Sequence, residues 1–154
     1  EFREALSRFA SGVSVVTTRD SSGRSHGITV SAFCSLSLDP PLVLICIEKA
    51  TASHYAFHES RSFIVNILDE SQQDISERFA APAADKFAAT DFEPGGDGIP
   101  RLRTALAVLE CRVTDVCDGG DHTIFVGSVE RAAAREGAPL VYFCSQSGTT
   151  MTGQ

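Results

Sequence analysis

The pattern of hydrophobic and polar residues along the chain is mainly that of short β-strands. Strand-length segments with alternating or continuous apolar residues lie at 13–18, 27–38, 42–48, 62–68, 105–116, 123–134 and 139–144. Turn-forming sequences separate several of them, including "RDSSGR", "DPP" and "CDGGDH". Strand and helix do not alternate regularly, so the pattern predicts an antiparallel barrel or sandwich of six or seven strands. The segment 42–48, apolar on both faces, is expected at the centre of the sheet.

A few short helices accompany the strands. Residues 2–9 carry apolar side chains at helical spacing before Gly12, and residues 71–80 begin with an S-x-x-D pattern. Thr51 is expected to cap a helix that begins near Ala52. The Ala-, Pro- and Gly-rich stretch 81–101 is a long connection of the kind that is often functional or mobile. One domain is expected over residues 1–145, followed by a disordered tail at 146–154.

Composition narrows the function classes. The chain has 154 residues with a net charge of −7, which argues against a nucleic-acid partner because phosphate backbones need a basic surface. No apolar run approaches the roughly 20 residues of a membrane span. The chain starts at Glu1 without a signal-peptide pattern, so a trimmed cytoplasmic protein is expected.

The cysteines and histidines give little indication of a metal. Five cysteines without a C-x-x-C pair indicate buried free thiols in a reducing compartment. His54 and His58 have the spacing of one helix face, but two ligands without a matching third are poor evidence for zinc. No metal site is predicted.

A row of hydroxyls is the first candidate for chemistry. In "GITVSAFCSLSL", Thr29, Ser31, Ser35 and Ser37 lie on one face of the predicted strand, and that face carries no charge. Neutral donors and acceptors at fixed spacing suit a flat ligand rich in heteroatoms, such as a flavin ring. Filling of a barrel interior or of a subunit interface is the commoner reason for such a row.

A candidate anion site follows directly along the chain. Lys49, Thr51 and Ser53 stand at the expected start of a short helix, where unpaired N–H groups favour a phosphate, although for this stretch alone ordinary capping is the commoner explanation. Lys86 and Phe87 in "DKF" could close over a phosphate and a ring, or simply anchor the loop. His122 after "GGD" could contact a substrate or be a solvated turn residue. No G-x-G-x-x-G turn is present.

Taken together, these segments resemble a known family. The motifs "HGITVSAFCSLSLDPPLVLICI", "KATASHYAF", "FIVNIL", "RFA…DKF" and "GDHTIFVGSV" occur in the order seen in flavin reductase components of two-component monooxygenases. The resemblance covers about residues 2–144. It implies a mainly β, antiparallel, Greek-key split barrel of the FMN-binding type.

The resemblance also implies roles for individual residues. The flavin site would be formed by Thr29, Val30, Ser31, Ala32, Cys34, Ser35, Lys49, Ala50, Thr51, Ser53, His54, Lys86 and Phe87. Within this set, the strand segment would line the ring, residues 49–54 would hold the phosphate, and "KF" would close the site. His122 would contact the nicotinamide of NADH. Relatives often carry an aromatic residue after the last strand, and none follows Phe143 here.

The activity implied is NAD(P)H-dependent reduction of FMN or FAD, with reduced flavin passed to a partner monooxygenase, in a homodimer. Two alternatives remain open at this point. One is a non-catalytic flavin-binding electron carrier, and the other is an enzyme similar to pyridoxamine-phosphate oxidase on the same barrel. The sequence does not decide between FMN and FAD, or between NADH and NADPH.

Overall fold

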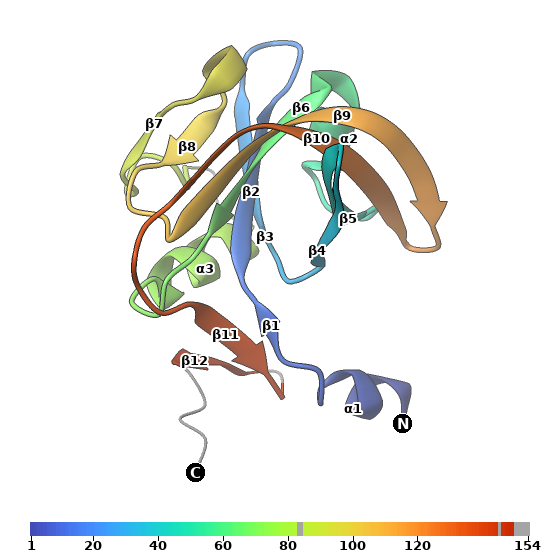
Figure 1. Ribbon diagram of the computed structural model, residues 1–154, viewed down its shortest axis with the longest axis vertical. Coiled ribbons are helices and arrows are strands. Elements are labelled where there is room, and N and C mark those ends of the chain that lie inside the picture. Colours follow the sequence, from blue (N-terminus) through green and yellow to red (C-terminus); the bar gives the residue numbers. More distant parts are fainter. Residues whose placement is uncertain (83–84, 145, 150–154) are drawn as a thin grey trace.

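The structure is a computed structural model that describes residues 1–82, 85–144 and 146–149. Strands dominate it, and the helices are short (Figure 1). The helices are α1 (Phe2–Leu6), α2 (His54–Ser60) and α3 (Gln73–Ala80), with a 3-10 turn η1 (Gly96–Gly98). The strands are β1 (Ser11–Gly12), β2 (Ser14–Arg19), β3 (Ser25–Val30), β4 (Phe33–Leu38), β5 (Pro41–Glu48), β6 (Ser62–Ile67), β7 (Phe92–Pro94), β8 (Pro100–Leu102), β9 (Ala107–Gly119), β10 (His122–Ala134), β11 (Leu140–Phe143) and β12 (Gln146–Thr149).

The main sheet has seven antiparallel strands in the order β3-β2-β6-β9-β10-β5-β4. Its two edge strands, β3 and β4, are consecutive in the chain and are separated only by Ser31 and Ala32. The sheet therefore curls back on itself, and the N–H of Cys46 on β5 donates to the carbonyl of Ala32 at 3.0 Å. This architecture confirms the predicted antiparallel split barrel.

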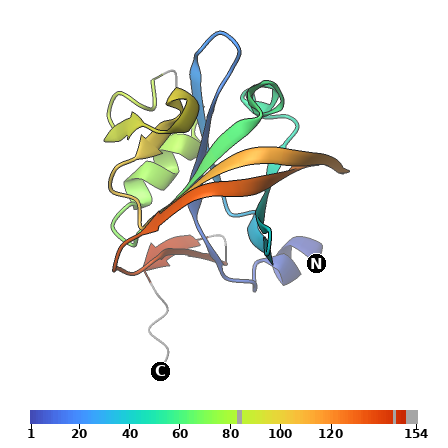
Figure 2. The same cartoon turned by 45° about the horizontal axis from the view of Figure 1, so that its top comes forward.

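The two faces of the sheet bury separate clusters of apolar side chains. The cluster inside the barrel includes Val16, Ile45, Phe63 and Phe125, and Phe57 of α2 closes one end of it. The cluster on the outer face includes Ile75 and Phe79 of α3 and Leu102 of β8, and Figure 2 shows α3 and the β7–β8 pair on the same side of the sheet. Because both faces of β2 and β6 are covered, nearly every residue of these two strands is buried.

The structure corrects two strand predictions. Residues 27–38 were expected to form one strand, but the chain bends at Ser31–Ala32 and divides into β3 and β4 at opposite edges of the sheet. The hydroxyl row is thereby split between two strands. The segment 42–48 was expected at the centre of the sheet, yet β5 is the second strand from one edge.

The helix and tail predictions also need correction. Helix α1 stops at Leu6, and α2 begins at His54 after Ser53, without a hydroxyl cap from Thr51. The connection 81–101 contains β7 and η1. Residues 146–149 pair with β11, although they were expected to be disordered. Residues 150–154 lie outside the described residues. No helix among the described residues is both long enough and apolar enough to cross a membrane.

Candidate functional site

A cavity of about 740 Å³ opens beside the edge strand β3. Three segments that are distant in the sequence form its walls: the β3 strand with the bend after it, the turn before α2, and the connection after α3. The start of β10 completes its mouth. Nine of the residues predicted for the site line this cavity, namely Thr29, Val30, Ser31, Ala32, Thr51, Ser53, Lys86, Phe87 and His122.

The β3 wall presents backbone more than hydroxyls. The Thr29 hydroxyl donates to the carbonyl of Ser76 at 2.6 Å and so fastens α3 to β3, while the Val30 side chain belongs to the barrel core. Since β3 is an edge strand of the main sheet, its outer peptide groups face the cavity without a neighbouring strand in that sheet. A neutral row of N–H and C=O groups therefore borders the cavity, where the sequence analysis expected a row of hydroxyls.

A cluster of aromatic rings supports the opposite wall. Phe79 is almost completely buried, and its ring centroid lies 5.1 Å from that of Phe87 and 5.5 Å from that of Phe92. The rings of Phe79 and Phe87 lie directly over Gly27, because a Cβ there would be only 2.8 Å from Cε1 of Phe79 and 3.0 Å from Cζ of Phe87. The Lys86 ammonium donates to the carbonyl of Phe79 at 3.2 Å, and burial lowers its pKa.

Hydrogen-bonded polar side chains form the end of the cavity near α2. Nδ1 of His26 lies 3.1 Å from the Ser53 hydroxyl, and its Nε2 lies 2.9 Å from Oδ2 of Asp20. The Tyr55 hydroxyl donates to the same carboxylate oxygen at 2.9 Å. The His26 and Asp20 side chains are only 9% and 5% exposed. Hydrogen bonds from Ser22 first, and then from His26, hold the pKa of Asp20 well below its usual range, so it is an anion at neutral pH.

Three residues expected to hold a phosphate do not line the cavity. Lys49 is turned toward the β9–β10 hairpin, where its ammonium pairs with Asp118. His54 points into the barrel, and its Nε2 lies 2.8 Å from the hydroxyl of Thr123. Burial lowers the pKa of His54, with the charges of neighbouring side chains adding to the effect. Ala50 is exposed beside them.

Cys34 and Ser35 were expected to extend the ring-binding strand. The bend at Ser31–Ala32 carries them to β4, on the far edge of the sheet, where both are exposed and outside the cavity lining. Cys117 is also exposed, and Cys46 and Cys144 are only partly buried, so the prediction of buried thiols holds for Cys111 alone; all five are free. Burial raises the pKa of the Cys111 thiol to about 12.

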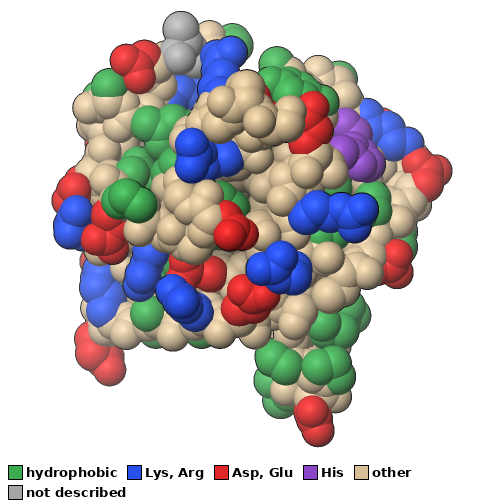
Figure 3. Space-filling model, turned by 90° about the horizontal axis from the view of Figure 1, so that it is seen from above, with side chains coloured by type: hydrophobic (Ala, Val, Ile, Leu, Met, Phe, Trp, Pro, Cys, Tyr) green, Lys and Arg blue, Asp and Glu red, His purple; other side chains and the backbone are tan. Residues whose placement is uncertain are grey.

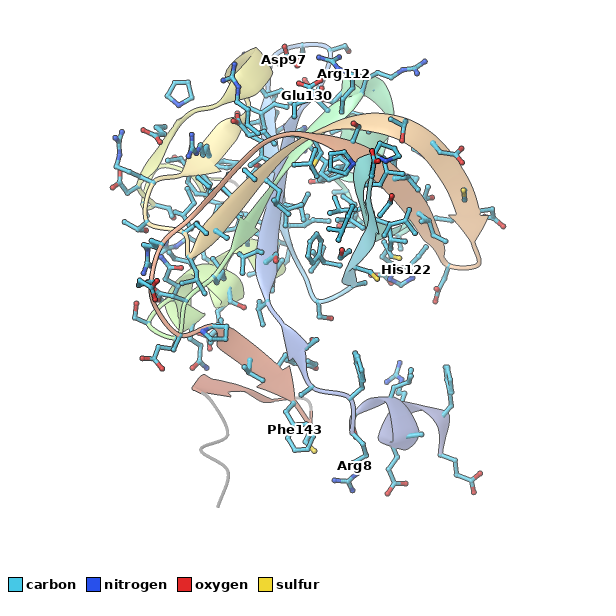
Figure 4. The ribbon with its side chains drawn as sticks, in the orientation of Figure 1. Arg8, Asp97, Arg112, His122, Glu130 and Phe143 are labelled. Carbon is cyan, nitrogen blue, oxygen red and sulfur yellow. The ribbon has the colours of Figure 1, made fainter. Side chains whose placement is uncertain are left out.

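His122 stands at the cavity mouth, at the end of the sheet opposite Asp97, Arg112 and Glu130 (Figure 4). Its Nδ1 lies 2.7 Å from the Asp121 carboxylate, and the side chain is 39% exposed. It pairs across the sheet with Glu48, which also lines the cavity. A half-exposed ring at this position is accessible to a second ligand that enters from solvent.

Sequence reasoning missed Asp20, His26 and Tyr55. The motif "HG" directly before the predicted ring-binding strand was a usable signal for His26 and Gly27, but Ser53 and Tyr55, which contact His26, are 27 and 29 residues away. Cys46 also lines the cavity.

On the face seen from above, positively charged Lys and Arg side chains are mixed with negatively charged Asp and Glu side chains, and neither charge dominates this face (Figure 3).

Comparison with known proteins adds independent information. A family model described as "Flavin reductase like domain" matches residues 6–150. The reductase component of 4-nitrophenol 4-monooxygenase/4-nitrocatechol 2-monooxygenase from Rhodococcus opacus is 44% identical over 148 residues, which are 96% of this chain and 79% of that protein. A probable flavin reductase from Rhizobium meliloti is 42% identical over 127 residues, covering 82% of this chain and only 41% of that longer protein.

Solved structures agree with the sequence matches. The NADH:FAD oxidoreductase SgcE6 of Streptomyces globisporus, in complex with NAD and FAD fragments, has a TM-score of 0.92 and 33% identity. The match covers 98% of this chain and 92% of that one. The flavin reductase PheA2 gives a TM-score of 0.88 with 36% identity, covering 98% and 97% of the two chains.

Proposed function

The chain belongs to the flavin reductase-like family, and we propose on that basis that it is an NAD(P)H:flavin oxidoreductase. It would reduce FMN or FAD and release the reduced flavin to a partner monooxygenase. The observation that supports this most strongly is the cavity, where a neutral strand edge, a polar end and an aromatic wall come together from three separate segments. It would act in the cytoplasm, where free thiols stay reduced.

The residues of the cavity fit a phosphorylated flavin. The backbone edge along residues 28–32 offers alternating donors and acceptors to the heteroatom-rich edge of the ring. At the other end lie the hydroxyls of Thr51 and Ser53, and the cavity lining also includes the cations Arg24 and Lys86, which suits an anionic phosphate. The volume of about 740 Å³ falls within the usual range for cofactor pockets.

The chemistry of reduction belongs to the two nucleotides, since NADH supplies a hydride and flavin accepts it. The protein's own contribution is positional. The β3 edge would fix the plane of the ring, and Phe87 would cover it while excluding water on that side. His122 would orient the nicotinamide at the mouth, because its ring is half exposed and held by Asp121. No side chain needs to act as an acid or a base in this step.

A homodimer forms part of the proposal. Large apolar side chains are exposed on α1 and on β4, namely Phe2, Leu6, Leu36 and Leu38, and Phe9 follows α1. Leu38 is 92% exposed, which is costly for an isolated chain in water. A second copy of the chain would cover these surfaces. Light scattering after size-exclusion chromatography should give twice the mass of the chain, and a monomeric mass would refute this part.

The experiment that tests the activity mixes catalytic amounts of protein with NADH and excess FMN, FAD or riboflavin in air. With at least one of the flavins, the NADH absorbance should fall steadily, and the amount of NADH oxidised should far exceed one equivalent of the protein. The alternative related to pyridoxamine-phosphate oxidase predicts turnover of that substrate without NADH. An electron carrier would consume at most a stoichiometric amount of NADH.

A further inference from the structure

The hydrogen-bond chain Asp20–His26–Ser53 at the polar end of the cavity has a fixed direction. Asp20 is ionised and can only accept hydrogen bonds, so Nε2 of His26, 2.9 Å away, must carry a hydrogen. In a neutral imidazole, Nδ1 then has only a lone pair. The Ser53 hydroxyl, 3.1 Å from Nδ1, therefore points its hydrogen at His26 and away from the cavity.

This direction of the hydrogen bonds leaves Ser53 without a donor for an anionic ligand in the cavity. A phosphate oxygen only accepts hydrogen bonds, so Ser53 can serve it only by turning its hydrogen into the cavity. Two lone pairs, on Oγ of Ser53 and Nδ1 of His26, would then face each other in a nearly buried position, which is unfavourable. A proton on Nδ1 removes the conflict, because the imidazolium donates to Ser53 while Ser53 donates to the phosphate.

We propose that Asp20 and His26 are a positioning pair that couples binding of the flavin phosphate to uptake of one proton by His26. The proposal rests on the flavin-binding function proposed above. Asp20 stabilises the resulting imidazolium by direct contact, and the pair, which carries a charge of −1 while His26 is neutral, becomes neutral once His26 takes up the proton. Because one proton is taken up together with the phosphate, phosphate binding would weaken as the pH rises.

Other titratable groups face the same space. Tyr55 contacts both Asp20 and Nε2 of His26, and its hydrogen bond to Asp20 raises its pKa, so it stays neutral. Arg24 lies directly before β3, and Glu59 of α2 accepts from the N–H of Ser21. Glu48, Cys46 and Lys86 line the cavity. Lys86 is the main competitor, because burial lowers its pKa and its deprotonation would also weaken phosphate binding.

The test compares FMN with riboflavin, which has the same ring but no phosphate. Dissociation constants are measured by fluorescence quenching from pH 7.5 to 9, where the FMN phosphate monoester, titrating near about pH 6, is already a dianion. The Kd for FMN should rise several-fold per pH unit, toward a limit of about tenfold for one linked proton. The Kd for riboflavin should change much less. Calorimetry in two buffers of different ionisation enthalpy should show proton uptake for FMN alone.

Two variants identify the responsible group. His26→Asn keeps an amide donor near the position of Nδ1, and this donor does not titrate. The affinity of the variant for FMN should therefore vary less than twofold over the same pH range. Ser53→Ala, a milder change for the fold, should weaken FMN binding at pH 7.5 and flatten its pH dependence, with riboflavin binding unchanged. Lys86 is intact in both variants.

Three results would overturn the inference. One is a pH-independent Kd for FMN in a protein that steadily oxidises NADH, which would leave the proposed function standing. Another is a Kd for FMN that still depends on pH in the His26→Asn variant, which would assign the pH dependence to Lys86. Failure to bind any flavin at any pH would overturn both this inference and the proposed function.

Discussion

Gly27 is the position where the smallest possible change should disturb the cavity most. An added Cβ would lie 2.8 Å and 2.9 Å from two carbons of the Phe79 ring and 3.0 Å from Cζ of Phe87. Ordinary contacts begin at 3.4 Å, so the Phe79 ring must move by about 0.6 Å. It has little room to do so, because Phe79 is 1% exposed and packs against Phe87 and Phe92.

Overpacking of this kind typically costs about 1–3 kcal/mol, partly offset by about 0.5 kcal/mol because alanine restricts the unfolded chain. Gly27→Ala should therefore lower the free energy of unfolding by about 1–2 kcal/mol, or roughly 2–8 °C in Tm for a chain of this size. Both rings line the cavity, so flavin affinity should also fall several-fold. Urea and thermal unfolding, together with a flavin titration, measure the two effects.

Gly12→Ala is the matched control. Gly12 also lies in a strand, but a Cβ there would meet nothing within 4 Å, so stability should be unchanged or slightly higher. The double variant Gly27→Ala/Phe79→Leu should be less destabilised than the sum of its single changes, since the shorter side chain relieves the clash. Equal stability of Gly27→Ala and Gly12→Ala would refute the close-packing argument.

Three further predictions concern the ends of the cavity and the thiols. Ser53→Asp places a negative charge beside the proposed phosphate and should weaken FMN binding at least tenfold, about 1.4 kcal/mol, with riboflavin affinity little changed in parallel titrations. His122→Ala should raise the KM for NADH several-fold, in line with about 1 kcal/mol for one hydrogen bond, as measured by stopped-flow reduction. A collapse of flavin affinity in that variant would place His122 in the flavin site instead. Cys111, whose pKa burial raises to about 12, should resist an aromatic disulfide reagent at pH 8 until the protein unfolds, while the exposed Cys34 reacts at once. Rapid labelling of Cys111 in the folded protein would contradict its burial.

The sequence predicted most of the architecture because the strand patterns are local. Alternation and apolar runs marked the strands, and the segments at residues 29–32, 51–53 and 86–87 do meet at one cavity with His122. The bend at Ser31–Ala32 was missed, since it contains neither Gly nor Pro and the alternating pattern continues through it. That single error carried Cys34 and Ser35 into the predicted site.

The remaining errors involve side chains whose partners are distant in the chain. Lys49 and His54 have the right spacing for an anion site, but Asp118 and Thr123, both about 70 residues away, determine where they point. The contact of His26 with Ser53 was overlooked for the same reason, because β3 and the turn before α2 come together only in the fold, whereas Asp20 is only six residues from His26. Residue type and spacing indicated the chemistry of the site, whereas tertiary pairing selected the side chains that form it.

Release of reduced flavin is the central claim and can be measured directly. Under anaerobic conditions, catalytic amounts of protein are mixed with NADH and a large excess of FMN or FAD, and the mixture is passed through an ultrafiltration membrane that retains the protein. The proposed activity predicts many equivalents of reduced flavin per chain in the filtrate. Reduction that stops near one equivalent, with the reduced flavin retained together with the protein, would contradict it and identify an electron carrier instead.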